Sequence, residues 1–283
     1  MSVMSVAPTR LRQIALVARD IKNAEYLLTT VLGTVVVFVD PQVAKWGLKN
    51  ILVAIGGDII EVCSPFETGT TAGRLLDRRG DGGYMIIMQT IDAVARRKHI
   101  ESENLAKVIY GYEHDDAACV QYHPKGILGG MMPELDSHAP TASNPTPLES
   151  RYSPWHACGN DYESYSAKMK QCAHLEFVSA TCRLEPGDDD TERAAKQWER
   201  LFGVASRDSE LLFTNMRLTF VPGVEGKSTG LESITIRVNS KQHFDRILDA
   251  ASKLGLREAS CIHMLGLKWH IVLADGWQEK SRL

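Results

Sequence analysis

The stretch that decides the fold is RLRQIALVAR, residues 10–19, an apolar run whose alternation is typical of a β-strand. Asp20 follows it and is suited to cap a helix. Apolar residues then recur at helical spacing over Ile21–Leu32, and Gly33 stands where helices commonly end. Three β-rich stretches come next: Thr34–Val39, Trp46–Ile55 and Asp58–Cys63. The sequence therefore predicts a β-α-β-β-β module.

The same order returns along the chain, which predicts an internal repeat. The second module has strand Gly83–Thr90, helix Ile91–Glu103 capped near Asp92, and strands Ala106–Tyr112, Ala117–Tyr122 and Gly130–Leu135. The third has strand His174–Cys182, a helix Thr191–Phe202 capped by Asp189 or Asp190, and a hairpin, Leu211–Thr214 with Met216–Val221. A shorter fourth module has strand Leu231–Val238, helix Gln242–Leu254 and a hairpin of Cys261–Leu265 with Lys268–Leu273. Pro133 lacks a ladder donor and predicts an edge strand or a bulge.

Residues 138–171 break the repeat, because they are rich in Pro, Ser and Thr and then in aromatic residues. We interpret them as a connector on the surface of one half. The predicted division is therefore an N-terminal pair of modules at 1–137 that carries the candidate site, the connector at 138–171, and a degenerate C-terminal pair at 172–283. The predicted fold class is α+β, with four βαβββ-type modules in two pairs.

The composition is that of a globular protein: 283 residues, 44% hydrophobic, 24% charged and a net charge of −3. The balanced charge argues against nucleic acid as a partner. The apolar runs are too short to span a bilayer, and the first ten residues lack a signal-peptide core. The six cysteines form no CxxC pair, which favours reduced thiols. We therefore expect a cytoplasmic protein whose partner is a small molecule.

Four stretches resemble the vicinal-oxygen-chelate superfamily of glyoxalases, bleomycin-resistance proteins and extradiol dioxygenases. These are LRQIALVARD (11–20), DIIEVCSP (58–65), GGYMIIMQT (82–90) and HPKGILGGMMPEL (123–135). The stretch GTTAGRLLDRRGDGGYM (69–85) is similar to a glyoxalase-like subgroup of unsettled activity. The resemblance implies cupped mixed β-sheets with helices outside. It also implies a divalent metal that binds two neighbouring substrate oxygens, with ligands on the first and last strand of each module.

The family's ligand positions fall here on Gln13 and Glu61 in the first module, and on Met85 and Glu134 in the second. The two carboxylates follow their opening positions at nearly equal offsets, 48 and 49 residues. Gln13, Glu61 and Glu134 are therefore the candidate metal ligands, and their oxygen atoms suit Mg²⁺ or Mn²⁺. Fe²⁺ and Zn²⁺ are further options. A metal-free site is another, because histidine is missing from both positions where the family often has it. Met85 is a poor ligand for hard ions and is placed among the substrate-binding residues.

Other residues complete the predicted site. Glu61, Glu134 and His123 are the candidate catalytic groups, although a turn before Pro124 explains His123 somewhat better. Arg74, after a glycine-flanked turn, is a candidate for binding a substrate anion, and Trp155 for lining a pocket. Gln13 would orient the substrate.

The resemblance favours a small-molecule enzyme with isomerase- or lyase-like proton transfer on an enolisable carbonyl compound. The alternatives are a metal-free ligand-binding or drug-sequestering protein and a ring-cleaving extradiol dioxygenase. A zinc site of His174, His263 and His270 is a further option, as are three unrelated histidines. A homodimer is compatible with all of these readings.

Overall fold

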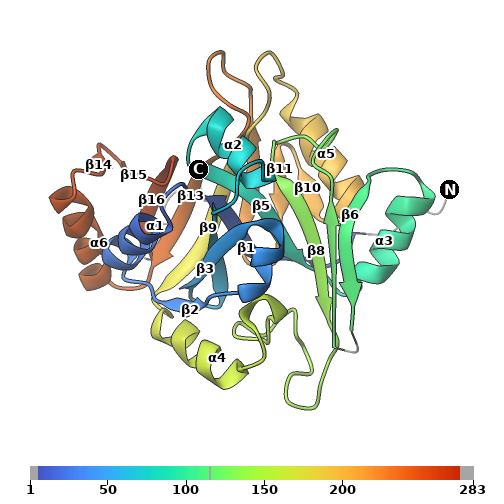
Figure 1. The fold of residues 1–283 in the computed structure, drawn as a ribbon, viewed down its shortest axis with the longest axis horizontal. Helices are drawn as coiled ribbons and strands as arrows, with labels where there is room; N and C mark the ends of the chain where they lie inside the picture. The colour runs from blue at the N-terminus through green and yellow to red at the C-terminus, as the bar shows by residue number, and fades with distance from the viewer. Residues whose placement is uncertain (1–5, 115, 275–283) are drawn as a thin grey trace. The chain divides into compact units, whose positions relative to one another are not determined.

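The computed structural model describes residues 6–114 and 116–274, and its strands form two eight-stranded mixed sheets (Figure 1). The first has the order β2-β3-β4-β1-β5-β8-β7-β6, and the second has β10-β11-β12-β9-β13-β16-β15-β14. Adding eight to each strand number of the first sheet gives the second. The repeat predicted from the sequence is therefore present as two sheets of identical topology, each formed within one chain.

The first sheet and its helices contain two modules. The first module consists of β1 (Arg10–Val17), α1 (Ile21–Leu27), the π-helix η1 (Leu28–Leu32), β2 (Val36–Phe38), the 3₁₀-helix η2 (Pro41–Trp46), β3 (Leu48–Ile55) and β4 (Asp58–Pro65). The helix α2 (Thr71–Arg79) leads to the second module, which consists of β5 (Gly82–Gln89), α3 (Ala93–Ser102), β6 (Val108–Glu113), β7 (Ala117–Tyr122) and β8 (Met132–His138).

The second sheet follows a connector that has structure of its own, η3 (His156–Cys158) and α4 (Tyr162–Gln171). The third module consists of β9 (Leu175–Arg183), α5 (Thr191–Phe202), β10 (Ala205–Arg207), β11 (Glu210–Leu212) and β12 (Arg217–Val221). The fourth consists of β13 (Gly230–Val238), α6 (Lys241–Lys253), β14 (Arg257–Glu258), β15 (Cys261–Met264) and β16 (Leu267–Leu273). The fourth module is complete, since β14 supplies the strand that the sequence pattern did not reveal.

The main helix of each module begins at a side-chain cap. In α1, α3, α5 and α6 a backbone N–H near the helix start donates to the cap, and the four caps are Asp20, Asp92, Asp190 and Ser240. Each cap satisfies a backbone donor that the helix leaves unpaired. The caps predicted from the sequence in the first three modules are confirmed, Asp190 rather than Asp189 in the third.

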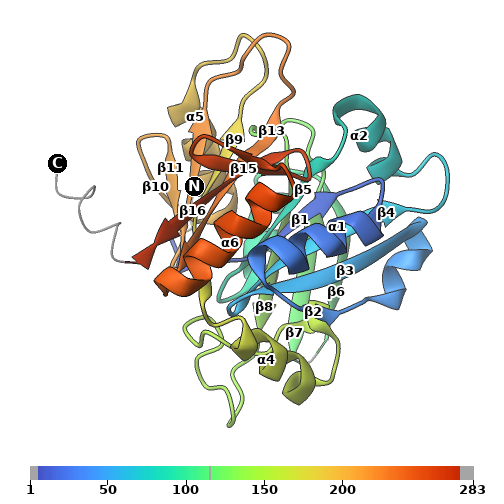
Figure 2. The ribbon, with the colours of Figure 1, turned by 90° about the vertical axis from the view of Figure 1, so that its left-hand side faces the viewer.

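By contacts, the chain divides into two compact units that do not follow the two sheets. Among the described residues, unit 1 contains 6–15, 83–114, 116–156 and 180–232, and unit 2 contains 16–82, 157–179 and 233–274. Within unit 2, α6 lies beside the turn that ends the first helix (Figure 2). A Cβ on Gly33 would lie 1.8 Å from Nη2 of Arg246, and Gly33 has a φ of +68°. Unit 1 repeats this arrangement, because a Cβ on Gly203 would lie 2.1 Å from Nη2 of Arg96.

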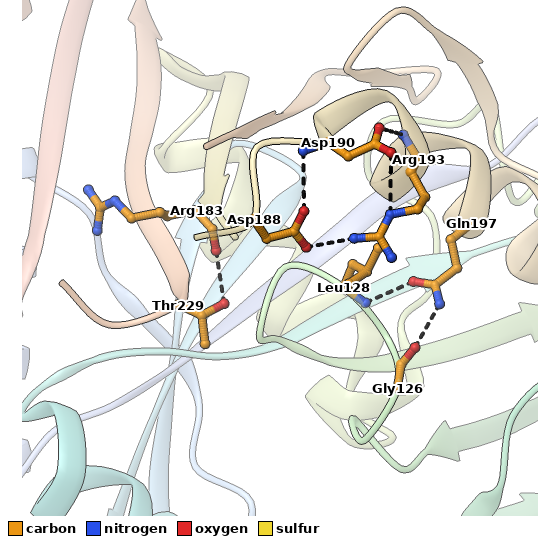
Figure 3. A network of polar contacts seen from close by, with 8 residues as sticks. All are labelled: Gly126, Leu128, Arg183, Asp188, Asp190, Arg193, Gln197 and Thr229. Carbon is orange, nitrogen blue, oxygen red and sulfur yellow. Dashed lines mark hydrogen bonds and ion pairs between the residues drawn. The ribbon is translucent and has the colours of Figure 1, made fainter. Parts of the chain in front are cut away.

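The third-module helix α5 fixes the loop between β7 and β8 of unit 1 (Figure 3). Gln197 Nε2 donates to the carbonyl of Gly126 at 2.6 Å, and Gln197 Oε1 accepts from the N–H of Leu128 at 2.8 Å. Trp198 Nε1 donates to the carbonyl of Leu128 at 2.9 Å. Trp198 is fully buried. The loop that leads into β8 is therefore held by side chains from a different module.

Two sequence-based expectations are wrong. Pro133 lies in β8, which is inside the sheet between β5 and β7. It is tolerated because the pairing of β7 with β8 begins only at Glu134, so no ladder donor is required of Pro133 on that side. The connector is not confined to the surface either, since Ser153, Trp155 and Cys158 are buried. The large, mostly apolar side chain of Trp155 is fully buried within unit 1, which removes its ring from water.

Candidate functional site

Four side chains of unit 1 bring their ligand atoms within 4.8 Å of one another. Cys119 comes from β7, Glu134 and Asp136 come from β8, and His156 comes from the connector. We call these four residues the buried cluster. Cys119, Glu134 and Asp136 are buried, whereas the side chain of His156 keeps 19% of its surface exposed. His156 therefore forms the edge of the buried cluster that faces solvent.

Strand register explains why three of these side chains meet. Cys119 pairs directly with Asp136, and Gln121 pairs with Glu134, in the antiparallel ladder of β7 and β8. Residues two apart on a strand share a face, so Glu134 and Asp136 point the same way and meet their cross-strand neighbours. Gln121 Nε2 donates to Glu134 Oε2 at 2.6 Å. This contact holds the Glu134 carboxyl in one orientation.

Asp136 is the most unusual member of the buried cluster. Its side chain is fully buried, and within the described residues neither of its oxygens makes a hydrogen bond. Burial raises the pKa of Asp136 well above its ordinary value, and the neighbouring Glu134 raises it further. A buried carboxyl without donors is costly unless it is protonated or meets a cation. Asp136 is therefore either protonated or an acceptor for a cation in the buried cluster.

One ring nitrogen of His156 faces Asp136 in the buried cluster, and the other ring nitrogen faces His138. Its Nε2 lies 3.6 Å from Asp136 Oδ2, and its Nδ1 lies 3.3 Å from Nε2 of His138. Burial lowers the pKa of His156 to about 3, and the charges of His138 and Arg12 lower it further in the same direction. The pKa of His138 falls to about 4, first because of burial and then because of Arg12. Both imidazoles are therefore neutral near pH 7, which is the form that binds metal ions.

The thiol of Cys119 is protonated in the absence of a cation. Burial raises its pKa, and the carboxyls of Glu134 and Asp136 raise it further. A thiol in such surroundings is a weak nucleophile, because the thiolate is the reactive form. A cation in the buried cluster would reverse this electrostatic balance.

The connector is anchored so that it delivers His156 to the buried cluster. Trp155 Nε1 donates to Gln13 Oε1 at 2.8 Å, and both side chains are buried. Arg12 donates from Nη1 and Nη2 to the hydroxyl and carbonyl of Ser153, at 2.8 and 2.7 Å. The Arg12 guanidinium also lies 5.3 Å from the centre of the Trp155 ring. Two of the predicted substrate-binding residues, Gln13 and Trp155, are thus brought together.

The donor set fits a metal ion. The buried cluster offers one thiol, two carboxyls and one neutral imidazole, and Asp136 has no other described hydrogen-bond partner. Three of these donors with an open fourth position would match a catalytic transition-metal site. The buried cluster contains one histidine, whereas the iron site of a ring-cleaving dioxygenase needs two with a carboxylate.

Glu61 lies in unit 2, with a partner that the sequence pattern did not identify. Asn50 Nδ2 donates to Glu61 Oε1 at 2.6 Å, and the thiol of Cys63 donates to the same oxygen at 3.3 Å. The expectation that a carboxylate in an apolar strand has a partner is therefore correct. The assignment of Gln13, Glu61 and Glu134 as joint ligands stays a prediction.

The remaining predicted residues are not among the four donors of the buried cluster, and two of them make local contacts. Met85 is buried and pairs with Met132 in the sheet. His123 is exposed and its Nδ1 accepts from the N–H of Lys125, which agrees with the turn interpretation. Arg74 donates to the carbonyl of Gly69 at 2.5 Å and to Thr71 Oγ1, so it closes its own turn.

The C-terminal histidines form no three-donor group within the described residues. His174 stacks on His243 with ring centroids 4.1 Å apart. His263 Nε2 lies 3.0 Å from Glu258 Oε2 and 3.2 Å from Cys261 Sγ on a small hairpin.

Comparisons with solved structures support the fold. The chain is similar to a hypothetical protein from Staphylococcus aureus, with a TM-score of 0.58, 10% identity and coverage of 94% of this chain and 99% of that one. Together with the repeated sheet order, this confirms the predicted α+β fold of paired βαβββ-type modules, which is the glyoxalase-like fold. No protein-family model matches the sequence, and no curated protein matches it.

Parts of the chain are also similar to two methylmalonyl-CoA epimerases. The enzyme from Streptomyces coelicolor, in complex with 2-nitronate-propionyl-CoA, has a TM-score of 0.42, 19% identity and coverage of 47% of this chain and 99% of that one. The Mycobacterium tuberculosis enzyme has a TM-score of 0.42, 22% identity and coverage of 50% and 94%. At these values the likeness concerns part of the fold and carries no assignment of activity.

Proposed function

We propose that the protein is a small-molecule enzyme of the vicinal-oxygen-chelate type. Its reaction would be an isomerase- or lyase-like proton transfer on an oxygenated, enolisable carbonyl compound. The observation that supports this proposal is the pair of buried carboxyls, Glu134 and Asp136, of which one is held by Gln121 and the other has no described hydrogen-bond donor. Buried titratable groups in different surroundings are a common basis of acid–base catalysis.

The two carboxyls would have separate roles. Glu134, oriented by Gln121, would take a proton from the carbon next to the substrate carbonyl. Cys119, Asp136 and His156 would hold a divalent metal, which supplies Lewis-acid stabilisation of negative charge on a substrate oxygen. Gln13 would fix Trp155 and, through the connector, the position of His156.

Exchange of carbon-bound protons tests the proposal without a known substrate. Purified protein, supplemented with Zn²⁺ or Mn²⁺, is incubated in D₂O with a panel of 2-keto acids, 2-hydroxy ketones and acyl thioesters, and ¹H NMR records the loss of the proton next to the carbonyl. We expect faster exchange for at least one compound, and a loss of about 100-fold or more in Glu134→Gln.

Two further variants complete the test. Glu149→Gln changes an exposed carboxylate of the connector and serves as the matched control, so it should keep the full exchange rate. Glu61→Gln tests the sequence-based assignment of Glu61 as a second catalytic group. Equal exchange by wild type and Glu134→Gln on every active compound would rule out the proposed role of Glu134.

One observation favours a second candidate, a ligand-binding protein. A cavity of about 330 Å³ lies within unit 2 and is lined by apolar and polar side chains: Val36, Val37, Phe38, Val39, Cys158, Asp161, Ser164, Tyr165 and Lys168. Its volume is at the lower end of small-molecule pockets. Binding of an apolar dye that survives a chelator and is weakened by Val37→Trp would support this candidate. Undiminished binding in that variant would count against it.

A further inference from the structure

We propose that the buried cluster binds a thiophilic divalent ion of the zinc class, with Cys119 Sγ as a ligand beside Asp136 and His156. This inference rests on the proposed function only in sharing its site, because it concerns which ion binds and through which atoms. The family resemblance implies ligands on the first and last strands of a module. Cys119 lies on β7 and His156 lies in the connector, so both are outside that pattern.

Two independent observations locate the ion. The four donor atoms converge within 4.8 Å, which is a separation that a single ion can bridge. Asp136 is fully buried, faces this group and makes no hydrogen bond within the described residues. A pair of buried carboxyls alone does not explain why a thiol and an imidazole converge on it. An ion bound by Cys119, Asp136 and His156 explains the position of all three side chains.

The chemistry of the donors selects the ion. Mg²⁺ and Ca²⁺ bind six or more oxygen atoms, and the buried cluster offers only the carboxyls of Glu134 and Asp136. Thiolate and imidazole instead suit Zn²⁺, Co²⁺ and Fe²⁺. The mixed sulfur, nitrogen and oxygen set therefore favours Zn²⁺ over Mg²⁺.

His138 acts as a positioning residue for this site. Its Nε2 lies 3.3 Å from Nδ1 of His156, and it also accepts from the backbone N–H of His156 at 3.2 Å. These contacts direct the other ring nitrogen, Nε2, toward Asp136. Metal-binding histidines are commonly oriented in this way by a partner on the second nitrogen.

The first module offers an internal control. Asn50 and Cys63 pair across β3 and β4 as Cys119 and Asp136 do across β7 and β8, and Glu61 corresponds to Glu134. There an amide replaces the thiol, and Asn50 donates to Glu61. Cys63 is also a buried thiol beside a carboxylate. Within the described residues, however, it does not belong to a group of three or more metal-donor side chains.

Cobalt spectroscopy tests the proposal on the full-length, metal-free protein. Co²⁺ is added, and the near-ultraviolet absorption of thiolate-to-cobalt charge transfer is recorded along with the visible bands. We expect a saturable thiolate band at one equivalent of Co²⁺, and its displacement by Zn²⁺ but not by Mg²⁺. Cys119→Ser should lose the band, and Cys63→Ser should keep it.

A second variant protects the test against misfolding. His156 lies at the solvent-facing edge, so His156→Gln should fold, keep the thiolate band and bind Co²⁺ more weakly than wild type. Far-ultraviolet circular dichroism checks each variant. A thiolate band that persists in Cys119→Ser, or Co²⁺ binding with no band in wild type, would overturn the inference. If the band behaves as expected but no panel compound exchanges its proton, the metal site stands and the proposed function fails.

Discussion

Trp155 shows at the residue scale how the connector and the first strand depend on each other. Its indole N–H donates to Gln13 Oε1 inside unit 1, and both side chains are buried. Loss of one partner of a buried hydrogen bond leaves the other without compensation for its lost water. The two residues therefore stabilise the segment that carries His156.

We predict that Trp155→Phe lowers the free energy of unfolding by about 1–3 kcal/mol, because Phe fills most of the space but cannot donate to Gln13. Trp46→Phe is the matched control, since Trp46 is 42% exposed, and should change stability by less than about 0.5 kcal/mol. Urea denaturation followed by circular dichroism measures both. Equal stability of the two variants would mean that the Gln13 contact contributes little.

The sequence pattern predicts Glu134 as a site residue but none of the residues that surround it in the structure. Glu134 was found because two modules carry a carboxylate at nearly the same offset. Asp136 and Cys119 join it only through strand register, and one residue of slippage would turn them to the opposite face. His156 comes from a segment outside the repeat, so no periodicity could place it.

At the scale of elements, local signals were sufficient for the main helix of each module and for its cap in the first three modules, but not for α4 in the connector. Asp20, Asp92 and Asp190 were identified because a cap acts within three residues of its own position. The interior position of β8 was missed, since it depends on pairing with β5 and β7, which are distant in sequence. The position of β8 in the sheet therefore depends on long-range strand pairing, which a local sequence pattern does not reveal.

The bridge from α5 to the β7–β8 loop leads to a prediction about an element (Figure 3). Gln197→Ala removes both hydrogen bonds to the loop and should lower the free energy of unfolding by about 1–2 kcal/mol. It should also speed hydrogen exchange of the Leu128 amide, because that N–H loses its acceptor. Lys196→Ala, on the same helix but paired only at the surface, is the control. Unchanged exchange at Leu128 would show that the loop is held by other contacts.

For the whole molecule, the repeat was predictable but its packing was not. Identical sheet orders follow from the repeated pattern of strands and helices. The compact units instead join the second module with much of the third, and the first with the fourth. Such pairing depends on which apolar faces meet, and these faces have the same period in every module.

Global stability should depend on pH through His174, in addition to His138 and His156. Burial lowers the pKa of His174 below its ordinary value of 6.5, and His243 and Arg246 lower it further. As pH falls below 6.5, His174 binds a proton in the unfolded chain but stays neutral in the folded chain. The free energy of unfolding therefore decreases toward the folded-state pKa, by at most about 1.4 kcal/mol per pH unit for this proton.

His174→Gln should make this pH dependence shallower between pH 7 and pH 5. Denaturant unfolding at each pH measures the slope, and His123→Gln, at an exposed turn, provides the control. A slope that is the same in His174→Gln and wild type would show that other groups cause the acid sensitivity.

The central claim is that the buried cluster is the metal-binding centre of the molecule. Anomalous diffraction from Zn²⁺-loaded crystals, recorded on both sides of the zinc edge, tests it most directly. We predict one peak in unit 1 within bonding distance of Cys119, Asp136 and His156. A peak at Glu61 or at the hairpin of His263, with none at the buried cluster, would contradict the claim.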